Sequence, residues 1–182
     1  MFVNLNQPLT HALSQIKIVT ARDYFELGVQ LRDIGQIEAA RDALLKAQSL
    51  DDAGETGMLA RKVIDARIPK YIGDSQANQL NSLGYRLRFE HKYDLAEQIF
   101  RLCIKRWPRF EFPYKNLGHM FIELRRFRDA KEVLEKLVEV NPNYARGWEL
   151  LGQAKAGLGD KVGSKICIDR ARELDPDDDA IN

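Results

Sequence analysis

The chain has 182 residues, of which 45% are hydrophobic and 30% charged, and its formal net charge is +1. This composition is typical of a globular protein, and the length predicts a single domain with a substantial core. No apolar run approaches the roughly 20 residues that cross a bilayer, so no membrane insertion is expected. Residues 1–17 lack a basic start followed by an apolar block, which indicates no signal peptide and favours a cytoplasmic protein.

The first predicted element is a helix at residues 8–19, where Leu9, Leu13 and Ile16 fall on one side. We expect the segment 1–20 to act as a capping helix for the elements that follow it. Dimerisation through this helix remains an alternative.

A Leu-Gly pair then recurs along the chain, at Gly28, Gly84, Gly118 and Gly152, and the last three glycines are 34 residues apart. A large residue stands four positions before each glycine, a small one twelve after it and a bulky apolar one sixteen after it. A proline 24 positions after the last three glycines ends the second helix, because it lacks an amide hydrogen and clashes with the preceding turn. The pattern predicts four antiparallel helix pairs, at residues 21–54, 77–110, 111–144 and 145–178.

This pattern resembles the tetratricopeptide repeat family over residues 21–52 and 77–176. The resemblance implies an all-α fold, a right-handed superhelical solenoid of antiparallel helix pairs whose first helices line a concave groove. Two copies depart from the pattern, with Asp52 in place of the proline in the first and Lys155 in place of an apolar residue in the fourth. Atypical copies are normal towards the ends of a repeat array.

The segment 55–76 interrupts the repeats between the first and second copies. A helix is predicted over residues 55–68, with Leu59, Val63 and Ala66 in one stripe, and a turn follows it. We expect this inserted helix to pack on the first repeat, and a hinge or a lid over the groove is the alternative. Past the fourth copy, residues 179–182 form an acidic tail end, and the apolar residues expected to be exposed on the last repeat are Leu150, Leu158 and Ile166.

The groove positions implied by the resemblance bring together amide, aromatic and basic side chains. Amides pair with an extended backbone, aromatic rings supply rigid apolar area, and basic groups, Arg88 included, meet a carboxylate. The predicted peptide-binding residues are Asn81, Tyr85, Phe89, Phe112, Lys115, Asn116, His119 and Arg146.

Some members of the family hold a C-terminal carboxylate in a five-residue clamp. Asn116 and Arg146 match that clamp, whereas Asn81, Tyr85 and Leu150 stand at its other three positions. Two matches in five do not predict a receptor for chaperone tails.

The basic residues are concentrated between Gly84 and Lys131, where twelve Lys and Arg face six Asp and Glu. Such a surplus with interleaved aromatic rings is compatible with RNA binding. The basic residues spread over both helices and the turns, however, so nucleic acid is not the expected partner.

No constellation of residues indicates catalysis. His11, His91 and His119 lack metal-ligand partners at a useful spacing, and no nucleophile set or phosphate-binding loop is present. Cys103 and Cys167 are expected to be buried structural thiols. We therefore expect no enzyme activity, no metal and no cofactor.

The sequence thus favours an interaction scaffold or chaperone-like adaptor that binds an extended peptide segment of another protein in the groove. Two alternatives stay open. One is a bacterial secretion-type chaperone with a dimerising N-terminal helix, and the other is a self-assembling repeat scaffold, which would be a homo-oligomer.

Overall fold

The computed structural model describes residues 20–34, 36–71 and 73–176, and within these ranges it consists of nine α-helices without a strand. The all-α fold class is therefore confirmed. The chain divides into two compact units, unit 1 (Met1–Arg61) and unit 2 (Lys62–Asn182), which differs from the single domain that the length predicts. Apart from Thr20, the predicted capping helix and the tail end lie outside the described residues.

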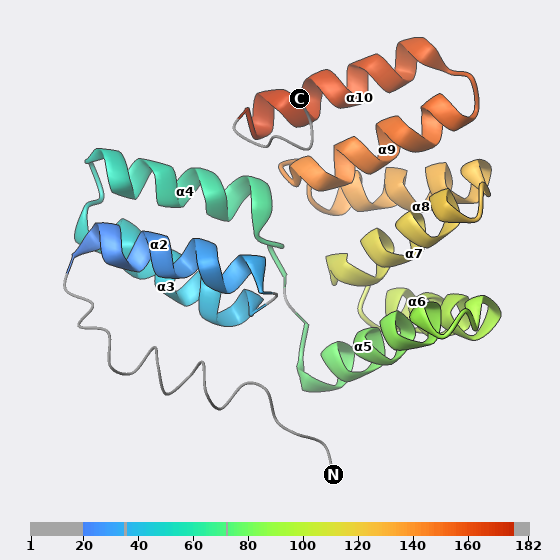
Figure 1. Cartoon of the computed structure of the whole chain (residues 1–182), viewed down its shortest axis with the longest axis horizontal. Helices are drawn as coiled ribbons and strands as arrows, with labels where there is room; N and C mark the ends of the chain where they lie inside the picture. The colour runs from blue at the N-terminus through green and yellow to red at the C-terminus, as the bar shows by residue number, and fades with distance from the viewer. Residues whose placement is uncertain (1–19, 35, 72, 177–182) are drawn as a thin grey trace. The chain divides into compact units, whose positions relative to one another are not determined.

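Unit 1 contains one helix pair, α2 (Ala21–Asp33) and α3 (Ile37–Leu50), which pack together as a hairpin (Figure 1). A capping box starts α2, since Thr20 Oγ1 accepts the Asp23 N–H at 3.2 Å and the Asp23 carboxylate accepts the Thr20 N–H at 2.9 Å. These bonds satisfy amide groups that the start of a helix leaves without partners.

The inserted helix is α4 (Glu55–Arg67), and the boundary between the units falls within it. Its first turns belong to unit 1, where Arg61 pairs with Asp52 at 2.8 Å. Its last turn belongs to unit 2, where Ala66 packs with Ala145 and Ala171. The end of α4 thus contacts the last repeat, a contact that the predicted packing on the first repeat did not include.

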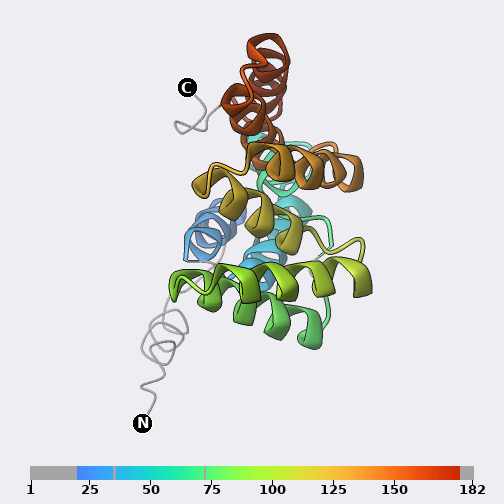
Figure 2. The same ribbon diagram turned by 90° about the vertical axis from the view of Figure 1, so that its right-hand side faces the viewer.

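Unit 2 holds three further helix pairs, which follow one another as a stack (Figures 1 and 2). The first helix of each pair packs on the second, and each second helix packs on the first helix of the next pair. The pairs are α5 (Ser75–Phe89) with α6 (Tyr93–Arg106), α7 (Glu111–Glu123) with α8 (Phe127–Val140), and α9 (Ala145–Gly157) with α10 (Lys161–Leu174).

The repeated glycines mark the points where paired helices approach most closely. A Cβ atom on Gly118 would lie 2.5 Å from Leu134 Cγ, and one on Gly84 would lie 2.7 Å from Phe100 Cε1. Both distances are too short for a side chain, so the glycine makes room for the bulky residue sixteen positions later. The same arrangement joins Gly28 with Leu44 and Gly152 with Ile168.

The large residue four positions before the glycine also makes a hydrogen bond. Tyr114 donates its hydroxyl to the Pro108 carbonyl at 2.9 Å, and Trp148 donates its Nε1–H to the Pro142 carbonyl at 2.8 Å. Each bond ties the start of a repeat to the proline turn that ends the previous one. The sequence pattern indicates only bulk at this position.

One residue in the turn of each pair in unit 2 has a positive φ, seven positions after the repeated glycine. The φ angle is 82° at Gly159, 58° at His91 and 57° at Arg125. Only glycine adopts this left-handed conformation without a steric cost. His91 is exposed at this turn.

The core of unit 2 is formed by side chains at the repeat positions, including the fully buried Phe100, Leu117, Phe121, Leu134 and Leu137. Cys103 and Cys167 are buried free thiols, as predicted, and burial raises the pKa of Cys103 to about 11. Among the described residues no helix is both long enough and apolar enough to span a membrane.

The prediction of exposed apolar residues on the last repeat is correct for two of the three residues. Leu150 is only 1% exposed, because it packs into the core of unit 2. Leu158 and Ile166 are exposed, as predicted, and Val162 lies exposed on the same hairpin.

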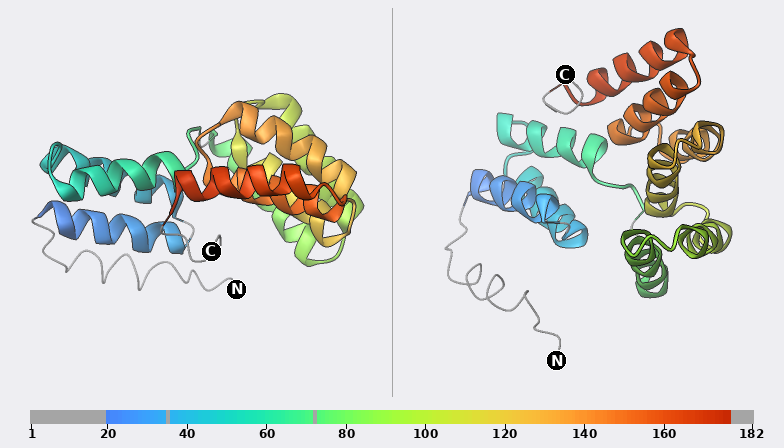
Figure 3. Two further views of the ribbon diagram at one scale, coloured as in Figure 1. Left: turned by 90° about the horizontal axis from the view of Figure 1, so that it is seen from above. Right: turned by 45° about the vertical axis from the view of Figure 1, so that its right-hand side comes forward.

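Consecutive first helices also contact one another, α5 with α7 and α7 with α9. They share one side of unit 2, and the helices α5 and α7 are seen on the same side of the stack in the right-hand view of Figure 3. We call the side chains that they present there the first-helix face. Its members are Asn81, Tyr85, Arg88, Phe89, Phe112, Lys115, Asn116, His119, Arg146 and Glu149.

Candidate functional site

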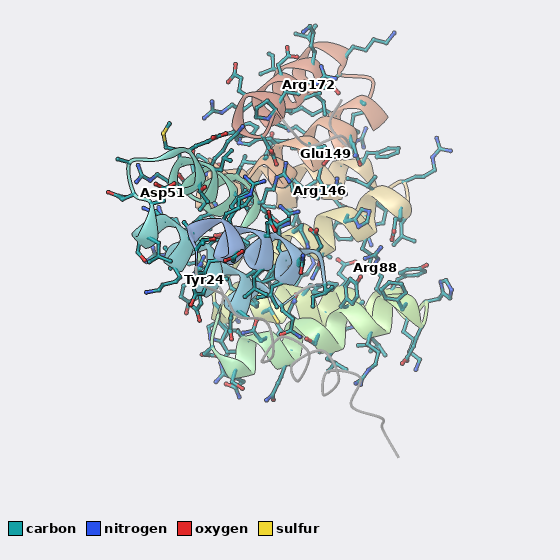
Figure 4. All side chains as sticks on the ribbon, turned by 60° about the vertical axis from the view of Figure 1, so that its left-hand side comes forward. Tyr24, Asp51, Arg88, Arg146, Glu149 and Arg172 are labelled. Atoms are coloured by element: carbon teal, nitrogen blue, oxygen red, sulfur yellow. The ribbon has the colours of Figure 1, made fainter. Side chains whose placement is uncertain are left out.

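The first-helix face contains all eight residues predicted to bind a peptide, and its charged members are held by contacts across three helices. Figure 4 labels Arg88 on α5 and Arg146 and Glu149 on α9. The helix α7 lies between these two helices and supplies Lys115 and His119.

Asn81 and Asn116 bind each other. The Asn116 Nδ2–H donates to Asn81 Oδ1 at 3.0 Å, which links α7 to α5. Asn116 is only 6% exposed, so much of its amide serves this helix contact. Of the two amides predicted to bind a peptide backbone, that of Asn81, which is half-buried, is therefore the better placed.

Aromatic rings occupy the end of α5 and the start of α7. Tyr85 and Phe89 are 45% and 63% exposed, and their rings meet edge to face with centroids 4.9 Å apart. The Arg88 guanidinium lies 5.7 Å and 5.5 Å from the two ring centroids. Exposed rings fixed in this way offer apolar contact area at a low cost in conformational entropy.

Both arginines of the face already have carboxylate partners. Arg88 donates its Nε–H to Glu123 at 2.9 Å, and Arg146 donates to Glu149. Glu149 is only 4% exposed and also accepts the Gln153 amide at 2.8 Å. The charges of Arg88 and Arg146 are therefore largely neutralised within the face.

Lys115 differs from the arginines, because no carboxylate among the described residues forms an ion pair with it. Its ammonium lies 5.0 Å from the centroid of the Phe112 ring. Burial, together with the positive charges of Arg146 and Arg88, lowers the pKa of Lys115 to about 8. Lys115 is thus the residue that gives the face its unneutralised positive charge.

His119 adds little charge at neutral pH. Burial, and then the charge of Arg88, lower its pKa below the ordinary value of 6.5, although Glu123 acts in the opposite direction. Its Nε2 lies 3.9 Å from a Glu123 oxygen. The ring is therefore mainly neutral at pH 7 and available as a hydrogen-bond donor and acceptor.

Two residues that shape the face, Glu123 and Glu149, are not among the predicted peptide-binding residues. Glu123 was missed because its partner Arg88 stands on another helix, 35 positions away in the sequence. Glu149 stands three positions after Arg146, a spacing that brings two residues together on a helix, so the sequence did contain that signal. In the described part of the chain, no three His, Cys, Asp or Glu side chains are grouped to hold a metal ion.

Comparison with known proteins relates the chain to one family. A sequence profile described as tetratricopeptide repeat matches residues 114–144. The Hsp70-Hsp90 organizing protein of Triticum aestivum is 32% identical over 90 residues, which cover 50% of this chain and 16% of that protein. The chain therefore spans less than a fifth of the length of this relative.

Solved structures share the fold. The first repeat domain of Spaghetti (RPAP3), bound to the HSP90 peptide SRMEEVD, has a TM-score of 0.57 and 20% identity, covering 62% of this chain and 89% of that one. MamA 41-end from Desulfovibrio magneticus RS-1 has a TM-score of 0.53 and 20% identity, covering 88% of this chain and 78% of that one. With the glycine spacing and the stacked hairpins, these matches show that the chain contains tetratricopeptide repeats.

Proposed function

We propose that the chain is an adaptor that binds an extended, acidic peptide segment of a partner protein on the first-helix face of unit 2. The proposal assigns no catalytic step to the chain. The observation that supports it most directly is Lys115, a largely buried ammonium that lacks a carboxylate partner among the described residues.

Burying a charge without a partner costs free energy, and the lowered pKa of Lys115 is an expression of that cost. A peptide carboxylate beside Lys115 would supply the missing opposite charge. Because Glu123 and Glu149 already pair with the two arginines, the face has room for about one further acidic group. Asn81 and the Tyr85 and Phe89 rings are placed to contact the rest of the segment.

The comparisons support a ligand of this chemistry. The HSP90 peptide named in the Spaghetti (RPAP3) structure contains three acidic residues in seven. That match shows a shared fold, and the acidic ligand comes to this chain only as part of the proposal.

The proposal is tested by titrating the chain with a fluorescent SRMEEVD peptide and with a version in which glutamine and asparagine replace its acidic residues. We expect the acidic peptide to bind and the amide version to bind at least about tenfold more weakly, because it cannot pair with Lys115. Lys115→Met should weaken the acidic peptide by about the same factor, whereas Lys115→Arg should keep most of the affinity.

Lys105→Met is the matched control, because Lys105 is an exposed lysine on the second helix α6. Equal loss of affinity in Lys105→Met and Lys115→Met would indicate a general effect of charge and would contradict the proposed site. Equal affinity for the two peptides would contradict the acidic ligand itself.

Self-association is a second candidate function, and the exposed apolar residues of the last hairpin favour it. Leu158, Val162 and Ile166 are 40%, 74% and 61% exposed. Sedimentation velocity over a hundredfold range of concentration should reveal a dimer or larger species that Ile166→Glu abolishes. A wild-type chain that stays monomeric would rule out this candidate. The secretion-chaperone alternative depends on residues 1–20, nearly all of which lie outside the described residues.

A further inference from the structure

The five residues after Ala66 contact the second and third repeats of unit 2, and we call residues 67–71 the connector. It leads from the end of α4 to Gly73 and the start of α5, and Figure 3 shows this part of the chain as an extended connection. Ile68 and Pro69 are fully buried, while the side chains of Lys70 and Tyr71 are exposed. The connector therefore contributes backbone groups and a few anchors rather than a helix of its own.

One anchor is the backbone of the connector. The Glu111 carboxylate, at the start of α7, accepts the N–H groups of Lys70 and Tyr71 at 2.7 Å and 3.1 Å. Glu111 is fully buried, so it is placed to recognise an extended backbone rather than to remain in water. The hydrogen bonds from two consecutive backbone amides to one carboxylate oxygen are charge-assisted. They do not depend on which side chains the two residues carry.

The other anchor is a charged side chain. Arg67 forms a two-bond pair with the Asp175 carboxylate, and its Nη2 donates to Oδ1 at 2.6 Å. Asp175 follows α10 and is only 3% exposed. The acceptors for the connector thus come from the second and third hairpins of unit 2, at positions far from the connector in the sequence.

The Glu111 acceptor is held in place without help from the connector. Asn141 donates its amide to the second Glu111 oxygen at 3.0 Å, and the Asn143 N–H fixes the Asn141 oxygen at 3.2 Å. The repeats themselves pack through their glycines and bulky apolar residues, which the connector does not supply. A preorganised acceptor for an extended backbone, together with a buried carboxylate for a guanidinium, is a feature of a peptide-binding site.

We propose that Glu111, Asn141 and Asp175 form a binding site for an extended basic segment, which the chain fills with its own connector as an exchangeable ligand. The ligand class is a short segment that contains an arginine and that offers the backbone N–H groups of the residues three and four positions after it. The site differs in chemistry from the first-helix face, which presents positive charge.

The connector also lies beside the first-helix face. Glu111 and Lys115 are one helical turn apart on α7, where side chains are neighbours, and Ala145, which packs on Ala66, directly precedes Arg146 on α9. Release of the connector should therefore make Lys115 and Arg146 more accessible. This regulatory consequence rests on the proposed function, whereas the connector site itself does not.

The site is tested in the full chain with a fluorescent peptide that has the sequence of residues 64–71. Arg67→Gln in the chain should loosen the connector, so this variant should bind the peptide at least about fivefold more tightly than the wild-type chain does. A peptide with Arg67→Gln should bind much more weakly to the same variant. Absence of binding to the Arg67→Gln chain, or equal binding to wild type and variant, would overturn the proposal.

Hydrogen exchange gives a second readout that needs no added ligand. The Lys70 and Tyr71 amides should exchange at least about tenfold faster in Arg67→Gln and in Asp175→Asn than in wild type, while amides in α7 and α8 keep their protection. Asp169→Asn, which removes an exposed carboxylate from α10, is the matched control and should leave both amides unchanged. Unaltered exchange in both connector variants would show that Arg67 and Asp175 do not hold the connector.

The two proposals can fail separately. If SRMEEVD binds the wild-type chain and Arg67→Gln equally, release of the connector does not control the first-helix face. If SRMEEVD binds neither protein but the 64–71 peptide binds Arg67→Gln, the connector site stands and the acidic-peptide function is wrong.

Discussion

The first and second helices of unit 2 treat charged residues in opposite ways. On the second helices, exposed ion pairs join residues one turn apart, such as Lys165 with Asp169 on α10 at 2.6 Å and Lys136 with Glu132 on α8 at 3.4 Å. On the first helices, three polar side chains are buried: Glu111, Asn116 and Glu149 are at most 6% exposed. Glu111 and Asn116 bond to groups from other parts of the chain, whereas Glu149 bonds to Arg146 and Gln153 on its own helix α9.

The exposed charges of the second helices maintain solubility, whereas the desolvated charges of the first helices cost stability. Exposed pairs on the second helices contribute little to folding, since water solvates their members equally well when apart. A half-buried charged group such as Lys115 is retained against a desolvation cost, which indicates a task other than folding. Part of the basic surplus between Gly84 and Lys131 is neutralised on α6, where Arg101 and Arg126 both pair with Glu97.

The largest loss of stability is expected from a substitution at the contact between a first and a second helix. Gly118→Val should destabilise the fold by about 3 kcal/mol, because its Cβ would lie 2.5 Å from Leu134 Cγ and neither helix can move without disturbing the core. Chemical denaturation measures the loss. The matched control is Ala156→Val at an exposed position of α9, which should cost less than about 1 kcal/mol through helix propensity alone. Similar losses in the two variants would contradict the close approach of α7 and α8.

A smaller effect of opposite sign is expected on the first-helix face. Lys115→Met should stabilise the fold by about 1–2 kcal/mol at pH 7, after allowance for partial solvent screening, because it removes a desolvated charge and keeps the apolar stem. The same variant should lose affinity for the acidic peptide. A gain in stability with a loss of binding would show that the charge is kept for its ligand, whereas a loss of stability would show an unrecognised partner of Lys115.

The difference in stability between the wild-type protein and Lys115→Met should depend on pH in a definite direction. Lys115 has a folded pKa of about 8, below its unfolded value, so the unfolded state binds more protons between these two values. The wild-type protein should therefore gain stability relative to Lys115→Met as the pH rises from 8 to about 10.5, and the difference should be constant below about pH 7. Peptide affinity should fall over the alkaline part of this range, and Lys115→Arg should abolish that fall, since arginine stays charged.

The fold could be predicted from the sequence because each repeat position is set by local packing. A glycine, the small residue twelve positions later and the bulky residue sixteen positions later meet within one hairpin, so their spacing alone indicates the helix pair. The hydroxyl of Tyr114 and the indole of Trp148 were expected only to fill space, because their bonds to proline carbonyls depend on how one repeat joins the next.

The candidate site was less predictable, because its key contacts join residues that are far apart in the sequence. The resemblance placed Lys115, Asn116 and Arg146 on one face, but burial of Asn116 depends on the approach of α5. The connector was not predicted at all. Arg67 and Asp175 are 108 positions apart, and no local periodicity relates Glu111 to the backbone of Lys70.

The smallest change in stability is expected for a substitution on a second helix. This variant tests whether charged residues on first and second helices differ in their cost to stability. Lys136→Met breaks an exposed pair with Glu132 at 3.4 Å, and methionine has nearly the helix propensity of lysine. The free energy of unfolding should therefore change by less than about 0.5 kcal/mol, with no change in peptide affinity. Chemical denaturation at several pH values, side by side with Lys115→Met, measures both lysines under the same conditions. If Lys136→Met gained as much stability as Lys115→Met, lysine removal would stabilise unit 2 wherever it occurs, and the lowered pKa of Lys115 would no longer distinguish the first-helix face.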